Sequence, residues 1–291
     1  MRKVYFDSAA TTQVRKEVIE KMTQVMSECY GNPSSTHAFG RAAKTLIEQA
    51  RKDVAKHLNV SAGEIVFTSG GTEADNLAIC SSVKDLGVTR IITSRIEHHA
   101  VLHTVQEMQD KHNVTVDYVN LKDCGSIDSS HLEELLGNST EKTLVSLMHI
   151  NNEVGNMLDI KAVAKLCKSH NALFHCDTVQ SVGHFKLDFS EIPVDFTAVS
   201  AHKFHGPKGV GFAFIRKNSG LKPMIVGGSQ ERGIRAGTES VHNIVGLSEA
   251  LNISYANLEE EKAYIKSLKQ YFKDQLQEHI PEASLNGGCS D

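Results

Sequence analysis

The feature that most constrains the fold of this chain is a repeated alternation of short apolar runs with longer amphipathic stretches. The apolar runs predict strands at residues 64–68, 90–93, 114–119, 144–148, 172–175, 195–200 and 211–215. Apolar residues at helical spacing predict helices between several of these runs, at residues 72–84, 98–111, 130–136 and 160–170. This alternation is typical of crossover units that build a mixed, mostly parallel sheet flanked by helices. We therefore predict an α/β fold whose functional loops gather at the carboxyl ends of the strands.

Helical patterns also lie on both sides of this alternating core. Two helices are predicted before the first strand, at about residues 14–25 and 39–58. A long helical region follows the last strand, from residue 241 to about residue 279, with a weak break near Asn252. The length of 291 residues is enough for one large domain and a smaller one.

Charge and composition exclude several classes of function. The formal net charge of -4 argues against a nucleic-acid-binding protein, which would carry a basic face. No apolar run approaches the length of a membrane-spanning helix, and the first residues contain no signal-peptide core. The six cysteines are scattered without a C-x-x-C pair, as expected of reduced thiols. We therefore expect a cytoplasmic protein that binds neither nucleic acid nor membranes.

A lysine lies directly after one predicted strand, in the segment Ser200-Ala-His-Lys203. A lysine at a strand end, among small residues, can be held partly desolvated, which lowers the pKa of its amine. The amine is then free to act as a nucleophile toward a carbonyl. Taken alone, Lys203 is better explained as a solvated loop residue, so its neighbours must decide.

A glycine-rich turn joins the first predicted strand to the next helix, in the segment Thr68-Ser-Gly-Gly-Thr72. Free N–H groups at a helix N-terminus, together with the hydroxyls of Ser69 and Thr72, form a suitable cradle for a phosphate. A plain turn with a capping box is the alternative. The segment is not a Walker motif, because no Gly-Lys-Ser/Thr follows.

Three further strand ends carry polar side chains. His98 begins a predicted helix, where its ring is able to lie flat on a planar ligand. Asn152 and Gln180 supply amides, and Asp177 supplies a carboxylate that is costly to bury without a cationic partner, either a protonated ring nitrogen or an arginine. His99 and His103 have the i, i+4 spacing of zinc ligands but lack the accompanying zincin carboxylate, so we predict no metal site.

Together these strand ends offer a phosphate cradle, a stacking ring, an acid, amides and a reactive lysine. Pyridoxal 5'-phosphate needs these five groups from a protein: the acid keeps the pyridine nitrogen protonated, and the lysine holds the aldehyde.

The sequence resembles the NifS-like cysteine desulfurases, which are class V of the pyridoxal-phosphate aminotransferase superfamily. The resemblance is clearest in Phe67-Thr-Ser-Gly-Gly-Thr-Glu-Ala-Asp-Asn-Leu77 and Ser200-Ala-His-Lys203. Further matching stretches occur in the family's order at residues 5–12, 30–37, 97–98, 151–153, 175–181 and 235–238. The matches therefore span essentially the whole chain.

The resemblance implies a fold-type I transferase that uses pyridoxal phosphate. Its large domain would comprise residues 12–245, and residues 1–11 with 246–291 would form part of a small α+β domain. The implied reaction converts L-cysteine to L-alanine and passes the sulfur to an enzyme cysteine, then to an acceptor or iron–sulfur scaffold protein.

The resemblance also implies a role for each site residue. Lys203 would hold the cofactor covalently, Asp177 would pair with the pyridine nitrogen, and Asn152 and Gln180 would face the phenolic oxygen. His98 would stack on the ring and assist proton transfer. The phosphate would be bound by Gly71, Thr72, Ser200 and His202, and by Thr238 of the other subunit in a homodimer.

One departure from the family pattern concerns the sulfur. The family's persulfide-forming cysteine and its substrate-binding arginine both lie downstream of the matching stretches, and Cys289 does not match the cysteine's loop. From this we expect a C-terminally truncated form, with an incomplete small domain and impaired sulfur transfer. A selenocysteine lyase, another class V lyase or aminotransferase, and a catalytically inactive cofactor-binding module remain open alternatives.

Overall fold

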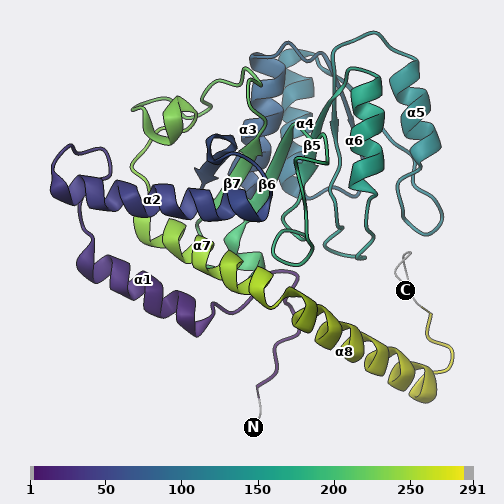
Figure 1. Cartoon of the computed structure of the whole chain (residues 1–291). Coiled ribbons are helices and arrows are strands. Elements are labelled where there is room, and N and C mark those ends of the chain that lie inside the picture. Colours follow the sequence, from purple (N-terminus) through teal and green to yellow (C-terminus); the bar gives the residue numbers. More distant parts are fainter. Residues whose placement is uncertain (1–2, 285–291) are drawn as a thin grey trace.

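The computed structural model describes residues 3–284 and shows one seven-stranded sheet with helices on both faces (Figure 1). The strands are β1 (Ile65–Thr68), β2 (Arg90–Thr93), β3 (Thr115–Tyr118), β4 (Thr143–Ser146), β5 (Leu173–Asp177), β6 (Phe196–Ser200) and β7 (Gly211–Ile215). Their order in the sheet is β1-β7-β6-β5-β4-β2-β3. The five strands from β6 to β3 are mutually parallel, whereas β7 runs antiparallel to both β6 and β1. The predicted mixed, mostly parallel sheet is confirmed.

The helices form two layers. One face of the sheet is covered by α3 (Gly71–Lys84) and α4 (His99–His112), which pack against each other. The opposite face carries α2 (Ala38–His57), α5 (Ser129–Gly137), α6 (Ile160–Ser169) and α7 (Val241–Ala256). The helix α1 (Lys16–Glu28) packs against α7, and α8 (Leu258–His279) extends away from the body (Figure 1).

Alternation along the strands explains why two cores form. In β7, Phe212 and Phe214 join the core under α2 and α7, whereas Ala213 joins the core under α3 and α4. Successive side chains of a strand point to opposite faces, so a strand buried on both sides is predominantly apolar. All residues of β1, β2, β4, β6 and β7 are buried, as this arrangement requires.

Several predicted boundaries were wrong by a few residues. Strand β4 ends at Ser146, two residues before the predicted end at Met148, and β5 ends at Asp177, two residues beyond the predicted end at His175. The break in the long helical region lies at Asn257 instead of near Asn252. The apolar face of α7 stays buried through Leu251 and Ser254, so the chain does not leave the core earlier.

Helix α8 differs from the other helices in its burial. Leu258 is its only buried residue, and several large apolar side chains along it are exposed: Tyr264, Ile265, Leu268, Tyr271 and Phe272. No helix within residues 3–284 is both long and apolar enough to cross a membrane. The proposed division into residues 12–245 and the two chain ends stays a prediction, and Cys289 lies outside the described residues.

Candidate active site

A cleft of about 730 Å³ opens at the carboxyl ends of β4, β5 and β6, which is the edge predicted for the functional loops. This volume is in the range of small-molecule sites. Nine of the ten residues predicted to bind a cofactor line it: Gly71, Thr72, His98, Asn152, Asp177, Gln180, Ser200, His202 and Lys203.

The glycine-rich turn forms one end of the cleft. Gly70 has φ +156°, a conformation that favours glycine, and no side chain caps the N-terminus of α3 that follows. A Cβ atom built on Gly71 would lie 2.6 Å from Cγ2 of Val179, so only glycine fits between α3 and the loop after β5. The first N–H groups of a helix have no partner within the helix, and they are therefore available to an anion.

Lys203 reaches the cleft from the short helix η2 (Ala201–Lys203), directly after β6. Its Nζ donates hydrogen bonds to the carbonyl oxygens of Ala9 and Ala10, the latter at 2.9 Å. Burial lowers the pKa of the Lys203 amine, while the charges of Asp177 and Asp7 act in the opposite direction. The amine is thus held by the N-terminal segment, which the sequence did not place beside it.

Asp177 is the last residue of β5 and is 5% exposed. Burial raises the pKa of Asp177 to about 8, and the neighbouring Asp75 carboxyl acts in the same direction. The N–H of Val179 donates to Asp177 Oδ1 at 2.9 Å. A buried carboxyl with a raised pKa and an open cleft in front of it is suited to a cationic partner.

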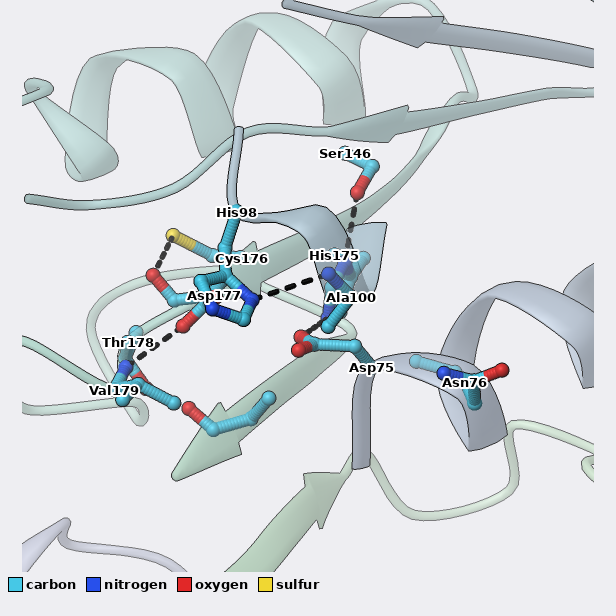
Figure 2. Close-up of polar contacts among 12 residues, drawn as sticks. Asp75, Asn76, His98, Ala100, Ser146, His175, Cys176, Asp177, Thr178 and Val179 are labelled. Carbon is cyan, nitrogen blue, oxygen red and sulfur yellow. Dashed lines mark hydrogen bonds and ion pairs between the residues drawn. The ribbon is translucent and has the colours of Figure 1, made fainter. Parts of the chain in front are cut away.

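His98 caps the N-terminus of α4 and contributes to the wall of the cleft. Its Nδ1 accepts a hydrogen bond from the Ala100 N–H at 3.1 Å, which fixes the ring (Figure 2). Burial lowers the pKa of His98, and the charges of His99 and Lys203 lower it further. A neutral ring at this position is able to stack on a planar ligand.

The remaining predicted groups are partly bonded within the chain. His202 Nδ1 lies 3.2 Å from the Thr11 hydroxyl, and Gln180 Nε2 donates to the Ala9 carbonyl at 3.0 Å. Asn152 Nδ2 donates to Glu153 at 2.7 Å. The cleft contains both amides, but the phenolic oxygen as their partner stays a prediction.

Thr238 does not line this cleft. It borders a separate cavity of about 130 Å³, together with Ser69, Glu231 and Arg235. Within one chain it is therefore apart from the other predicted phosphate ligands, and its contact across a homodimer remains a prediction.

Two buried carboxyls were not singled out from the sequence. Asp75 lines the cleft from α3, and Glu97 lies buried immediately before His98. Burial raises the pKa of Glu97 to about 8. Asp75 lies within the family-matching stretch from Phe67 to Leu77. A helical wheel of α3 would have placed it one turn beyond Gly71, on the same face as the phosphate cradle.

These residues fit pyridoxal phosphate. Asp177 offers a buried acid that forms no ion pair with any described residue, Gly71 leaves a space that a Cβ would fill, and Lys203 carries a partly desolvated amine. Within residues 3–284 no group of three or more His, Cys, Asp or Glu side chains is arranged to hold a metal ion, and the rings of His99 and His103 stack 5.2 Å apart.

Comparisons with known proteins agree with this site. The model of the aminotransferase class-V family matches residues 4–290. A cysteine desulfurase IscS of Dictyoglomus turgidum is 42% identical over 292 residues, covering 100% of this chain and 73% of the relative. A solved NifS-like protein is 40% identical with a TM-score of 0.90, over 95% of this chain and 76% of the other. A structure described as SspA in complex with cysteine is 37% identical with a TM-score of 0.82, over 86% of this chain and 72% of the other.

Proposed function

This chain belongs to the aminotransferase class-V family and is a pyridoxal-phosphate-dependent cysteine desulfurase, and from that premise we propose which of its residues act on L-cysteine. The observation that carries the assignment is that Lys203 and Asp177 line one cleft whose far end is the uncapped N-terminus of α3. One end of the cleft is therefore suited to a phosphate, the middle to a flat ring, and the Lys203 side to a reacting amine.

Different residues would hold the different groups of the cofactor. The backbone N–H groups of Gly71 and Thr72, with Ser200 and His202, would bind the phosphate, and His98 would stack on the ring. Asp177 would pair with the ring nitrogen, and Lys203 would hold the aldehyde. When bound, the cofactor withdraws electrons from the Cα of an attached amino acid and so stabilises negative charge there.

Lys203 is also placed to act as the base at the substrate, once the substrate amine has replaced it at the aldehyde. Burial lowers the pKa of the Lys203 amine, which favours the neutral form that can take the proton from Cα of cysteine and return it to the product. His98, whose pKa is also lowered, is the second neutral base at the cleft wall.

The sulfur of the substrate cysteine must be transferred to an acceptor thiol. Among the described residues no cysteine lines the cleft: Cys80, Cys167 and Cys176 are buried, while Cys29 and Cys124 lie elsewhere. We propose that the acceptor thiolate, from a cysteine outside residues 3–284 or from a partner protein, attacks Sγ of the substrate. A bond forms between the two sulfurs as the Cβ–Sγ bond breaks, so the sulfur leaves as a persulfide and the electron pair of the broken bond stays with the substrate carbon. Protonation of Cβ and of Cα then gives alanine.

We also propose a homodimer in which Thr238 of one subunit contacts the phosphate site of the other. The position of Thr238 outside its own cleft supports this arrangement, as does the exposed apolar segment at Ile225 and Val226. Light scattering on the purified protein measures the oligomeric state, and a monomer that binds the cofactor fully would contradict the proposal.

The central test is covalent attachment of the cofactor. The protein is loaded with pyridoxal phosphate, reduced with borohydride and digested, and mass spectrometry locates the modified lysine. We expect the label on Lys203 and its loss in Lys203→Ala. Lys208→Ala is the matched control, because Lys208 borders the same cleft but is exposed. Labelling of Lys208, or unchanged labelling of Lys203→Ala, would overturn the assignment.

A further inference from the structure

Asp75 and His175 form a pair of buried ionisable groups next to Asp177 (Figure 2). His175 and Asp177 are two residues apart on β5, so both side chains point to the same face of the sheet. Asp75 approaches them from the first turns of α3. The exposed fractions are 1% for Asp75 and 0% for His175, so water solvates neither.

The contacts of His175 and Asp75 leave open whether a proton lies between the two side chains. His175 Nδ1 lies 2.9 Å from the Ser146 hydroxyl, and His175 Nε2 lies 3.3 Å from Asp75 Oδ1. Within the described residues, neither Nε2 nor Oδ1 makes a hydrogen bond to any group. Two buried polar atoms that face each other at this distance are satisfied together if a proton lies between them.

The surrounding charges limit how many protons the pair can hold. Asp177, Glu97 and Cys176 are the acidic groups around the pair, and His175 and Lys203 are the groups whose positive charge would act on Asp177. With no proton, the pair would add a second buried carboxylate beside Asp177. With two protons, it would carry an imidazolium that takes Asp177 as its counter-ion and so occupies the carboxylate proposed to pair with the cofactor. Only the state with one proton is neutral and leaves Asp177 unengaged.

Burial also indicates which atom carries the proton. It raises the pKa of Asp75 well above its usual value and lowers the pKa of His175 to about 4. Both directions favour a protonated acid beside a neutral imidazole.

We propose that Asp75 keeps its proton at neutral pH and donates it in a hydrogen bond to His175 Nε2, while His175 Nδ1–H donates to Ser146. Asp75 and His175 are thus positioning residues that act through Asp177. With Nε2 occupied, His175 cannot take up a proton and become the counter-ion of Asp177. That carboxylate remains free for the cofactor nitrogen. Only the last statement, that Asp177 remains free for the cofactor nitrogen, rests on the proposed function.

The first experiment tests whether Asp75 is protonated in the native protein without cofactor. Denaturant unfolding is measured between pH 7 and 8.5, above the pKa of both groups in the unfolded chain. Native Asp75 holds a proton that the unfolded chain has released, so stability falls as pH rises. In the unchanged protein, release of this proton on unfolding multiplies the unfolding equilibrium constant by about ten for each pH unit. We expect this factor to be absent in Asp75→Asn.

Asp188→Asn is the matched control for this test. Hydrogen bonds from Ser190 and Asn59 lower the pKa of Asp188, so the control has no proton to lose in this range. An unchanged slope in Asp75→Asn would overturn the proposal.

The second experiment locates the proton. Nitrogen-15 NMR of the imidazoles, assigned by comparison with His175→Gln, should show His175 neutral with its proton on Nδ1. A doubly protonated ring, or a neutral ring with its proton on Nε2, would overturn the placement.

The third experiment measures the effect on the cofactor. Asp75→Asn keeps a donor for Nε2 and should bind pyridoxal phosphate within about threefold of the unchanged protein. Asp75→Leu removes the donor, frees His175 to take a proton, and should weaken binding about tenfold, more at pH 6 than at pH 8. Equal binding of the two variants at both pH values would overturn the positioning role. Failure of the unchanged protein to bind the cofactor would instead refute the proposed function and leave the first two measurements valid.

Discussion

Asp177 lies opposite Ala198 in the parallel pairing of β5 with β6, and Lys203 follows Ala198 by five residues in η2. The register of two neighbouring strands therefore delivers a buried carboxyl and a partly buried amine to one cleft. Parallel strands share one carboxyl-terminal edge, which explains how groups from separate crossover units meet there.

The first prediction concerns the charge of Asp177. Asp177→Asn removes the acid that pairs with the cofactor nitrogen and keeps the size of the side chain. We expect alanine formation from cysteine, assayed with an added thiol acceptor, to fall by about 100-fold or more. Asp188→Asn serves as the surface control and should retain full activity. Comparable rates for Asp177→Asn and the unchanged protein would contradict the role of Asp177.

The second prediction concerns the space beside Gly71. The Cβ of Gly71→Ala would lie 2.6 Å from Cγ2 of Val179, whose N–H donates to Asp177, so the Val179 side chain or the start of α3 must shift. We expect the affinity for pyridoxal phosphate, measured by absorption titration, to fall about tenfold. Gly137→Ala is the control, since a Cβ there meets no atom within 4 Å. Equal affinities for the two variants would show that the cradle tolerates a side chain.

The third prediction concerns Glu97, whose Oε1 lies 2.6 Å from the Ser94 hydroxyl. Burial raises the pKa of Glu97 to about 8, so the native protein holds a proton that the unfolded chain loses near pH 4. The stability linked to Glu97 is fully present below pH 4 and is lost as pH rises toward 8. Unfolding experiments between pH 5 and 7.5 should therefore show a smaller loss of stability with pH in Glu97→Gln. A slope identical to that of the unchanged protein would mean that Glu97 is ionised when buried.

The fourth prediction concerns a buried ion pair between α2 and the loop that carries Thr238. Arg51 contacts Glu231 through two hydrogen bonds of 2.6 and 2.8 Å, and Glu231 also accepts one from the Phe67 N–H at 2.8 Å. Glu231→Gln removes the buried carboxylate and leaves Glu48, 3.1 Å from Arg51 Nε, as the remaining charged partner of Arg51, so we expect a loss of about 1.5–3 kcal/mol in the free energy of unfolding.

The neighbouring residue provides the control for that measurement. Arg232 pairs with Glu48 at 3.0 Å, and both side chains are substantially solvated. Arg232→Gln should cost less than about 1 kcal/mol. A similar small loss for both variants in denaturant unfolding would show that the Arg51–Glu231 pair contributes little.

Much of the candidate site was predictable because its residues follow local rules. A strand, a turn and a helix start can each be recognised within about ten residues, and Gly71, Asp177 and Lys203 all stand at such junctions. The parallel topology then requires these junctions to share one edge of the sheet. The grouping of six of the nine cleft residues therefore followed from order along the chain, whereas Gly71, Ser200 and His202 were predicted from the family resemblance.

The sequence by itself thus determined the alternation of strands and helices and the edge at which the functional groups gather. The tertiary structure alone decided which atoms touch: the Ala9 and Ala10 carbonyls on Lys203, Arg51 against Glu231, and Asp75 facing His175. These partners are separated by 100 to 194 residues, and no local periodicity links them. Burial, and with it the pKa of Lys203, Asp75 and His175, depends on how whole layers pack, so the protonation of the site could be read only from the folded chain.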